Sequence, residues 1–280
     1  MTRNWLDYCK TFIPNVIDRH KEMLGRECNL VNPTRLSDKL EWLKVYDSTF
    51  LKTYCSDKIT ARKYVTNKLG KDISIPLIGT FDSFDDIEFE KLPMNYVIKT
   101  NHGSHTNIIV RNGKIDKQNA KKKFNAWLQQ DWSWWGYELF YTLIPRKILV
   151  EQYMNDGHSD LVDYKFLCFN GVPLYCQVIS DRHNSKKRLN YYDMNWTPCI
   201  NMSRKDFPAN YNELDYKPVT FELMKEYAAI LSTDFKFVRV DFYEINNKCY
   251  FGELTFTPGA AYIQYTNDNI DYELGKLLQL

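Results

Sequence analysis

Apolar and polar residues alternate most clearly in one late stretch of the chain, residues 238–261, VRVDFYEINNKCYFGELTFTPGAA. In its first part, VRVDFY, the alternation predicts a strand, because successive side chains of a strand point to opposite faces. One face carries three apolar side chains and the other carries Arg239, Asp241 and Tyr243. We therefore expect a strand that is buried on one face and charged on the other.

The residues that follow predict a hairpin. Asn246-Asn247 is a turn signal, and residues 249–254 predict a return strand that carries Glu253 near its end. Such a hairpin brings Glu253 and Asp241 together. Two carboxylates on adjacent strands, with an arginine beside one of them, suit a divalent cation that also binds phosphate oxygens. A surface hairpin with a cross-strand Arg–Asp ion pair explains the same spacing equally well.

Apolar residues at helical spacing predict helices in residues 4–52, interrupted at Asn32-Pro33. A further helix is expected to begin near Ser56-Asp57 and to end at Gly70, with Lys58 in its first turn. A cation in a first turn opposes the helix dipole, which indicates a nearby anion, although a solvated lysine is the simpler interpretation.

The middle of the chain predicts alternating strands and helices. The predicted elements are strands at 74–78, 96–99 and 108–110, a helix at 116–127, a strand at 146–154, and a hairpin of 162–169 with 174–179 around Asn170-Gly171.

Composition limits the class of protein. With 44% hydrophobic and 26% charged residues, 280 residues form one large domain or two to three lobes with a packed core. The formal net charge of +2 gives no global signal for nucleic acid as a partner. The seven cysteines are dispersed without a C-x-x-C pair, so we interpret them as mostly buried, reduced thiols of a cytoplasmic protein, not as a disulfide framework or zinc site. No apolar run approaches the roughly 18 residues of a membrane span, so any membrane role is peripheral.

Candidate phosphate-binding residues follow the strand at 96–99. Lys99 ends that strand, and the loop after it, residues 101–106 (NHGSHT), has one glycine, hydroxyl groups and backbone N–H groups that can close over phosphates. It is no Walker A motif, and a plain hairpin turn has a similar composition. His102 and His105 are candidates for catalysis or metal binding, but the absence of a third ligand at a suitable spacing favours hydrogen bonding within the loop.

Three further patterns carry candidate chemistry. Residues 146–154 run from an apolar strand into a polar hinge, and adenine often binds to such extended backbone. Asp163 and Lys165 place charge on one face of a strand. Four tryptophans can stack on sugars, although core packing is the simpler interpretation: Trp127, Trp132, Trp134 and Trp135.

Taken in order, these motifs resemble the ATP-grasp fold. The motifs are Asp57-Lys58, Val97-Ile98-Lys99 before a Gly/Ser loop, Leu149-Val150-Glu151, Arg239-x-Asp241, and Glu253-x-Thr255 ahead of Pro258-Gly259. More narrowly, the chain from about residue 35 to its end resembles the TupA-like (teichuronopeptide biosynthesis) branch, which is found with surface-polysaccharide genes and often called glycosyltransferase. The residues that carry this resemblance are Leu92-Pro93, Lys99 to Ser104, Asp163 to Phe166, Phe169-Asn170-Gly171, Asp181-Arg182 and Gly252 to Phe256.

The resemblance implies a role for each matching residue. Lys58 and Lys99 would hold ATP phosphates, His102 and the Gly103-Ser104 loop would cover them, and Glu151 with Tyr153 would lie at the adenine, while Asp163 would contact the γ-phosphate or acceptor. Asp241 and Glu253 would bind Mg²⁺, Arg239 would stabilise the charge that develops during transfer, and Lys165 and Arg182 would assist catalysis. Thr255 replaces the usual asparagine as third metal ligand, which leaves one or two ions open.

The resemblance also implies an architecture and an activity. The expected fold is α/β (α+β): a helical segment at 1–50, then ATP-grasp lobes at 51–152 and 153–280 whose mainly antiparallel sheets grip ATP. The expected activity is ATP- and Mg²⁺-dependent carboxylate–amine ligation through an acyl phosphate, joining an amino acid to a uronic acid or amino sugar of a surface-polysaccharide precursor in the bacterial cytoplasm. Peripheral contact with a lipid-linked precursor fits this expectation.

Three alternatives stay open. A sugar kinase on the same fold would leave a phosphate in the product instead of an amide. A nucleotide-sugar glycosyltransferase of capsule or O-antigen biosynthesis is the second alternative, although the Arg-x-Asp and Glu pair on a hairpin is not an Asp-x-Asp motif after a Rossmann-like half. A polysaccharide-binding module built on the tryptophans is the non-enzymatic alternative.

Overall fold

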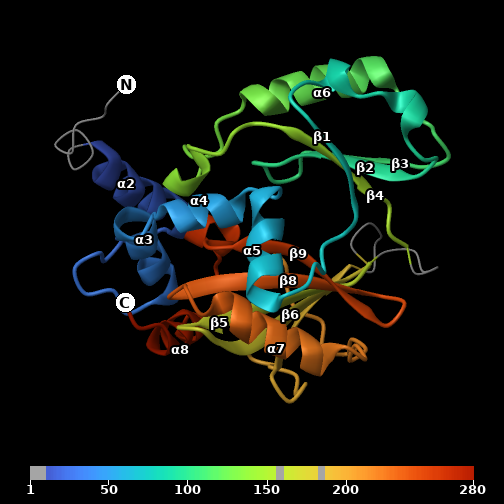
Figure 1. Cartoon of the computed structure of the whole chain (residues 1–280). Coiled ribbons are helices and arrows are strands. Elements are labelled where there is room, and N and C mark those ends of the chain that lie inside the picture. The colour runs from blue at the N-terminus through green and yellow to red at the C-terminus, as the bar shows by residue number, and fades with distance from the viewer. Residues whose placement is uncertain (1–10, 156–160, 182–186) are drawn as a thin grey trace.

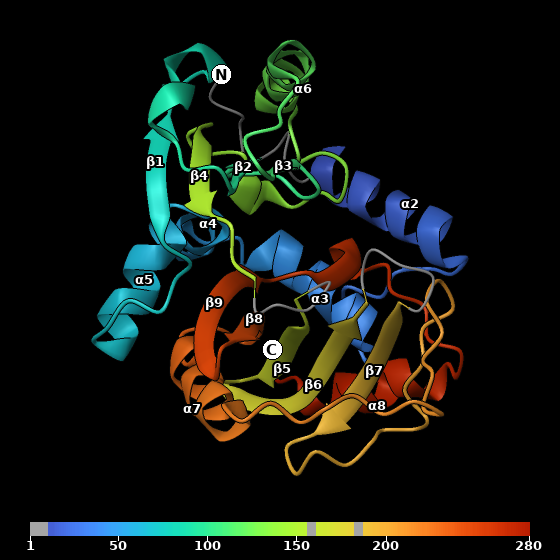
Figure 2. The same cartoon turned by 90° about the vertical axis from the view of Figure 1, so that its right-hand side faces the viewer.

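The computed structural model describes residues 11–155, 161–181 and 187–280. Its strands form two antiparallel sheets, one of four strands in the order β1-β4-β2-β3 and one of five in the order β7-β6-β5-β8-β9. Figures 1 and 2 show the four-stranded sheet above the five-stranded one. The strands are β1 (Leu77–Phe81), β2 (Tyr96–Thr100), β3 (Asn107–Val110), β4 (Ile148–Gln152), β5 (Asp163–Phe169), β6 (Val172–Ser180), β7 (Arg188–Asp193), β8 (Phe237–Ile245) and β9 (Lys248–Thr255).

Helices lie before, between and after these strands. The α-helices are α2 (Ile13–Leu24), α3 (Leu36–Tyr46), α4 (Phe50–Ser56), α5 (Thr60–Leu69), α6 (Lys117–Gln129), α7 (Phe221–Ser232) and α8 (Asn269–Leu277). Short 3-10 helices are η2 (Phe84–Asp86), η3 (Phe89–Lys91), η4 (Leu139–Tyr141) and η5 (Pro258–Ala261).

The N-terminal helices differ from the predicted helical run in where they break. The predicted start at residue 4 lies outside the described residues. Gly25, with a φ of 69°, ends α2, and residues 25–35 are not helical. Glycine adopts this left-handed conformation without a steric penalty, so the break begins there and extends past the predicted one at Asn32-Pro33.

The helix predicted from Ser56-Asp57 also begins later, at Thr60. The Asp57 carboxylate accepts the backbone N–H of Ile59 at 2.8 Å and forms a turn between α4 and α5. Lys58 therefore lies in this turn and not in a first helical turn, which corrects the helix-dipole argument. Gly70 ends α5 with a φ of 69°, as predicted.

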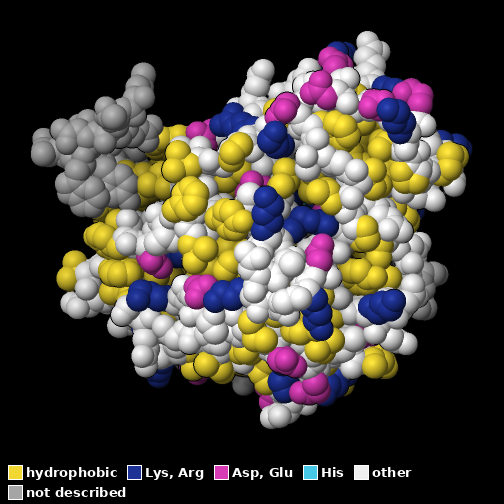
Figure 3. Space-filling view, in the orientation of Figure 1, with side chains coloured by type: hydrophobic (Ala, Val, Ile, Leu, Met, Phe, Trp, Pro, Cys, Tyr) yellow, Lys and Arg dark blue, Asp and Glu magenta, His cyan; other side chains and the backbone are white. Residues whose placement is uncertain are grey.

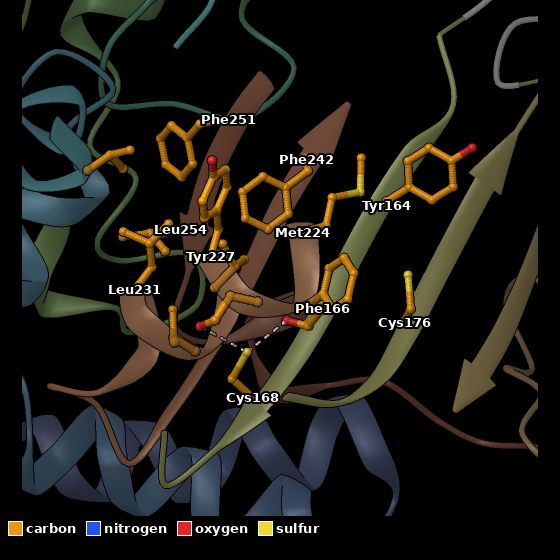
Figure 4. Close-up of a cluster of buried hydrophobic side chains, with 14 of the residues drawn as sticks. Tyr164, Phe166, Cys168, Cys176, Met224, Tyr227, Leu231, Phe242, Phe251 and Leu254 are labelled. Atoms are coloured by element: carbon orange, nitrogen blue, oxygen red, sulfur yellow. Dashed lines mark hydrogen bonds between the residues drawn. The ribbon is translucent and has the colours of Figure 1, made fainter. Parts of the chain in front are cut away.

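Each sheet buries an apolar face under helices. The four-stranded sheet packs Ile98, Val110 and Val150 against Phe124 of α6. The five-stranded sheet packs β5 and β8 against α7 in the cluster of Figure 4, where the Cys168 thiol lies 3.6 Å from the Phe166 carbonyl and 3.9 Å from the Ala228 carbonyl. Four of the six described cysteines are buried and all six are free, which agrees with the predicted reduced thiols.

The opposite face of the five-stranded sheet is shared between a second core and a polar region. At one end, helices α3 and α8 pack on Leu167, Phe169 and Phe237. Further along the same strands, the charged side chains of β5, β8 and β9 face the four-stranded sheet, and the candidate site lies there.

Candidate active site

A cavity of about 330 Å³ lies between the two sheets. In the space-filling view, lysine and arginine side chains gather near the middle of the face shown (Figure 3). The predicted site residues that line the cavity are Lys58, Lys99, Gly103, Ser104, Glu151, Tyr153, Asp163, Lys165 and Glu253. These residues come from both sheets, from the loop between β2 and β3, from the end of β4 and from the turn before α5, so the fold gathers most of the predicted set in one place.

A bulge in the β8–β9 hairpin determines where Glu253 lies. Asn246 and Asn247 have φ angles of 52° and 59°, which suit a two-residue hairpin turn. The register shifts by one residue at Gly252, so that Glu253 pairs with Asp241. Because directly opposed residues of an antiparallel pair share a face, the shift places both carboxylates on the charged face.

The charged row extends across a third strand. Lys165 of β5 pairs in register with Asp241 of β8. The Lys165 ammonium contacts Asp241 Oδ2 and lies 3.1 Å from Asp163 Oδ1. Asp163 and Lys165 are both buried, so each charge is held by an oppositely charged neighbour instead of by water.

Arg239 connects the predicted metal ligands. Its guanidinium donates to both oxygens of Asp241 at 2.6 Å, and Nη2 also lies 2.9 Å from Glu253 Oε1 and 3.0 Å from Thr255 Oγ1. Oxygens of three side chains thus converge on one cationic nitrogen. An all-oxygen set fits Mg²⁺, which takes hard oxygen ligands and completes its shell with substrate phosphates and water.

The two carboxylates differ in exposure and in pKa. Asp241 is 1% exposed and burial raises its pKa, although Arg239 and Lys165 oppose that rise. The Glu253 side chain is 43% exposed, and the cations of Arg239, Lys165 and Lys58 outweigh its desolvation and lower its pKa to about 2. Glu253 is therefore ionised at neutral pH and accessible from the cavity.

Lys58 is held against the loop of residues 101–106, called the polar loop below. Its backbone N–H donates to Asn101 O at 3.1 Å, and its ammonium donates to Gly103 O at 2.6 Å. Burial lowers the pKa of Lys58, while the charge of Glu253 opposes that effect. A second anion in the cavity would favour the charged ammonium further.

Glu151 lies between two cations. Its carboxylate is 2.5 Å from Lys99 Nζ and 3.1 Å from Arg62 Nη1. Arg62, which also lines the cavity, is not among the predicted site residues. The signal available was its position four residues after Lys58, but a charged residue at that spacing is also common on a solvated helix face.

Some predicted residues lie outside the cavity lining. His102 is 3% exposed and its Nδ1 lies 3.3 Å from Asn101 Oδ1, which agrees with the loop hydrogen bonding that the spacing favours. Arg239 and Thr255 hydrogen-bond to Glu253, which lines the cavity, and Asp241 is joined to Glu253 through Arg239. The predicted Arg182 lies outside the described residues.

The tryptophans divide between the core and the surface. Trp127 packs edge-on against Phe124 at 4.9 Å between ring centroids. Trp132 lies over the polar loop, because a Cβ on Gly103 would come within 2.8 Å of its indole nitrogen. Trp135 is 57% exposed. None of the four lines the cavity.

Comparison with known proteins shows which family the chain belongs to. A family model described as TupA-like ATPgrasp matches residues 38–279. The chain belongs to the TupA-like ATP-grasp family. This match confirms the predicted resemblance and, with the two antiparallel sheets, the predicted fold class. No curated protein matches the TupA-like chain in sequence.

Solved structures resemble the TupA-like chain at low identity. The D-alanine–D-alanine ligase of Bacillus anthracis complexed with ATP is 17% identical, with a TM-score of 0.41 over 72% of this chain and 54% of that one. The L-amino acid ligase of Bacillus licheniformis is 18% identical, with a TM-score of 0.44 over 74% and 44%. The D-alanine–D-alanine ligase of Helicobacter pylori is 12% identical, with a TM-score of 0.43 over 80% and 58%. The TupA-like chain thus spans about half the length of these proteins.

Within the described part of the chain, none of the helices combines the length and the apolar character needed to cross a membrane.

Proposed function

We propose that this protein is an ATP- and Mg²⁺-dependent carboxylate–amine ligase. The observation that carries the proposal is the convergence of Asp241, Glu253 and Thr255 oxygens on Arg239 Nη2, beside a cavity with several cations in its lining. A nucleoside triphosphate needs both features, because its phosphates require cations and its metal requires oxygen ligands.

The lining residues are suited to hold phosphates. Lys58 lies at the polar loop, Lys99 lies on β2, and Lys165 lies on β5, so positive charge approaches the cavity from three directions. Asp241, Glu253 and the Thr255 hydroxyl would hold Mg²⁺, which neutralises charge on the transferring phosphoryl group when bound. Glu151 and Tyr153 lie at the β4 end of the cavity, where we place the adenine.

The reaction has two balanced steps. A substrate carboxylate oxygen attacks the γ-phosphorus of ATP, which gives an acyl phosphate and ADP. A neutral amine then attacks the acyl carbon, the amide C–N bond forms, the C–O bond to the phosphoryl group breaks, and inorganic phosphate leaves with the proton that the amine loses. Arg239 is a fixed cation beside this centre, and such a preorganised charge stabilises a developing oxyanion most effectively.

We further propose a sugar-linked substrate. Its support is the TupA-like family membership. The reaction would join an amino acid to a uronic acid or amino sugar of a surface-polysaccharide precursor.

Thermal unfolding tests nucleotide binding. ATP with Mg²⁺ should raise the midpoint of the wild type, because a ligand that binds only the folded state stabilises it. In Glu253→Gln, the part of this rise that depends on Mg²⁺ should disappear. The control Glu226→Gln, at an exposed position on α7, should behave like the wild type. A rise with UDP-sugars but none with ATP would reject the ligase and favour a glycosyltransferase.

Product analysis separates a ligase from a kinase. Hydroxylamine attacks an acyl phosphate and gives a hydroxamate, whereas the phosphate ester of a sugar does not react in this way. Candidate uronic acids should therefore give a hydroxamate with ATP, Mg²⁺ and hydroxylamine. A phosphorylated sugar without hydroxamate would identify a kinase instead.

A further inference from the structure

A second group of polar side chains lies away from the cavity, among the N-terminal helices. His20 belongs to α2, Cys28 to the non-helical segment after it, and Asp38 to α3. One potential ligand atom from each residue lies within 4.8 Å of the others. His20 and Asp38 are buried, and Cys28 is partly exposed.

The histidine ring is oriented by a fourth residue. His20 Nδ1 lies 3.4 Å from Glu41 Oε1, and both side chains are fully buried. A carboxylate that accepts the N–H of one ring nitrogen leaves the lone pair on the other nitrogen, as in many carboxylate–histidine–metal arrangements. His20 Nε2 is 3.3 Å from Asp38 Oδ1, which is an ion-pair distance, but the contact is not aligned as a hydrogen bond. Against its desolvation, the neighbouring Asp38, Cys28 and Glu41 raise the pKa of His20.

We infer that His20, Cys28 and Asp38 bind one Zn²⁺ ion and that Glu41 orients His20. Imidazole nitrogen, thiolate sulfur and carboxylate oxygen together are a ligand set that zinc accepts. The site is independent of the proposed ATP cavity, where no described cysteine forms part of the lining. The absence of a C-x-x-C pair argues against a zinc site in the sequence, but these ligands come from three separate segments.

The observed distances are close to those of a tetrahedral site. Ligands about 2.0 Å from zinc lie about 3.3 Å apart, as His20 Nε2 and Asp38 Oδ1 do. The Cys28 sulfur lies within 4.8 Å of both atoms, whereas a sulfur and a nitrogen or oxygen ligand of one zinc ion lie about 3.5 Å apart, so the sulfur must move closer to bind the same ion. Cys28 lies outside any helix, so a rotation of its side chain can supply that movement.

Two cations border the site and must be compatible with it. Arg26 Nη1 lies 2.7 Å from Asp38 Oδ1, and Lys44 Nζ lies 3.0 Å from Glu41 Oε2. A carboxylate oxygen has two lone pairs, so Asp38 can accept from Arg26 while it binds a metal. Lys44 holds Glu41 in place through the oxygen that does not face His20. The bound ion would connect α2 to α3 across residues 25–35.

Cobalt spectroscopy tests the proposal on the full chain after treatment with a chelator. Co²⁺ should bind one ion per chain with a thiolate-to-cobalt charge-transfer band, and Zn²⁺ should abolish that band by displacement. Cys28→Ser should lose the band. Cys199→Ser removes another partly exposed cysteine and should keep it. Glu253→Gln should also keep it, so failure here is distinguishable from failure of the ligase proposal. Absence of the band in the wild type, or its persistence in Cys28→Ser, would overturn the inference.

Alkylation of the wild type gives a second test that does not depend on a variant. A thiolate bound to zinc is a poor nucleophile, so Zn²⁺ should slow iodoacetamide labelling of Cys28 by about tenfold or more and leave Cys199 unchanged. Mass spectrometry of peptides resolves the two sites. Equal labelling rates of Cys28 with and without Zn²⁺ would overturn the inference.

Discussion

Burial determines the protonation of the histidine in the polar loop. His102 is 3% exposed, and its desolvation, together with the charges of Arg146 and Lys58, lowers its pKa to about 4. The imidazole is therefore neutral at pH 7. A neutral His102 adds no positive charge next to Lys58, and its Nδ1 can donate to Asn101 Oδ1. We interpret it as a support of the loop and not as a phosphate ligand.

This pKa predicts a pH dependence of stability. The unfolded state binds a proton on His102 below about pH 6.5, whereas the folded state does so only below about pH 4. The free energy of unfolding should therefore fall by up to about 3 kcal/mol from this group as the pH falls from 7 to 4. Urea unfolding of the wild type and His102→Gln measures the difference. The control His105→Gln, at an exposed position of the same loop, should follow the wild type. Parallel curves for wild type and His102→Gln would contradict the prediction.

At the scale of elements, one residue in β9 determines which face Glu253 occupies. A regular ladder from the turn at Asn246-Asn247 would place Gly252 opposite Asp241 and Glu253 opposite Val240. Val240 is fully buried in the core under α7, so Glu253 would be directed into apolar packing. The observed pairing of Glu253 with Asp241 requires the extra residue, Gly252.

We predict that Gly252→Ala disturbs the site more than the fold. A Cβ there would lie 3.1 Å from the Asp241 carbonyl oxygen, so the hairpin must move by a few tenths of an ångström. The free energy of unfolding should fall by about 1–3 kcal/mol, and the Mg²⁺-dependent rise of the midpoint with ATP should shrink. Urea and thermal unfolding measure the two effects. Lys248→Ala, at an exposed position of the same strand, is the control. A full Mg²⁺ response in Gly252→Ala would show that the bulge tolerates the added carbon.

At the scale of the whole molecule, the N-terminal helices complete the core of the five-stranded sheet. Leu36, Leu40 and Leu43 of α3 pack with Leu167, Phe237 and α8. The segment that the sequence analysis separates as residues 1–50 thus contributes a face to the sheet built from the last part of the chain. Those predicted boundaries stay a prediction, but α3 shares its core with β5 and β8.

We predict that Leu40→Ala destabilises the five-stranded sheet. Leu40 is 4% exposed, and a cavity at such a position costs about 2–5 kcal/mol in the free energy of unfolding. Tryptophan fluorescence and far-UV circular dichroism in urea should shift together, because α3 and the sheet share one core. Leu143→Ala, at a residue that is 70% exposed, should change stability by less than about 0.5 kcal/mol. Loss of helix signal before the remaining transition would show that the N-terminal helices unfold independently.

Elements with local signals can be predicted from the amino-acid sequence. Alternation in VRVDFY identified the buried face of β8, Asn246-Asn247 identified the hairpin turn, and Gly70 identified the end of α5. Each signal depends on the conformational preference or spacing of neighbouring residues, so no distant contact is needed to interpret it. The ordered series of motifs also predicted the family, and the family match confirms it.

Tertiary structure alone decided how these pieces meet. Some features depend on the register of a strand pair, as the bulge at Gly252 does. Others join residues that are far apart in the chain: Lys58 with the polar loop, Arg62 with Glu151, and α3 with the five-stranded sheet. A single register shift moves a side chain to the opposite face of a sheet without changing composition or alternation. Long-range ion pairs likewise leave no periodic trace in the sequence. The position of Glu253 beside Asp241 was thus expected from the hairpin, but only the folded register produces it.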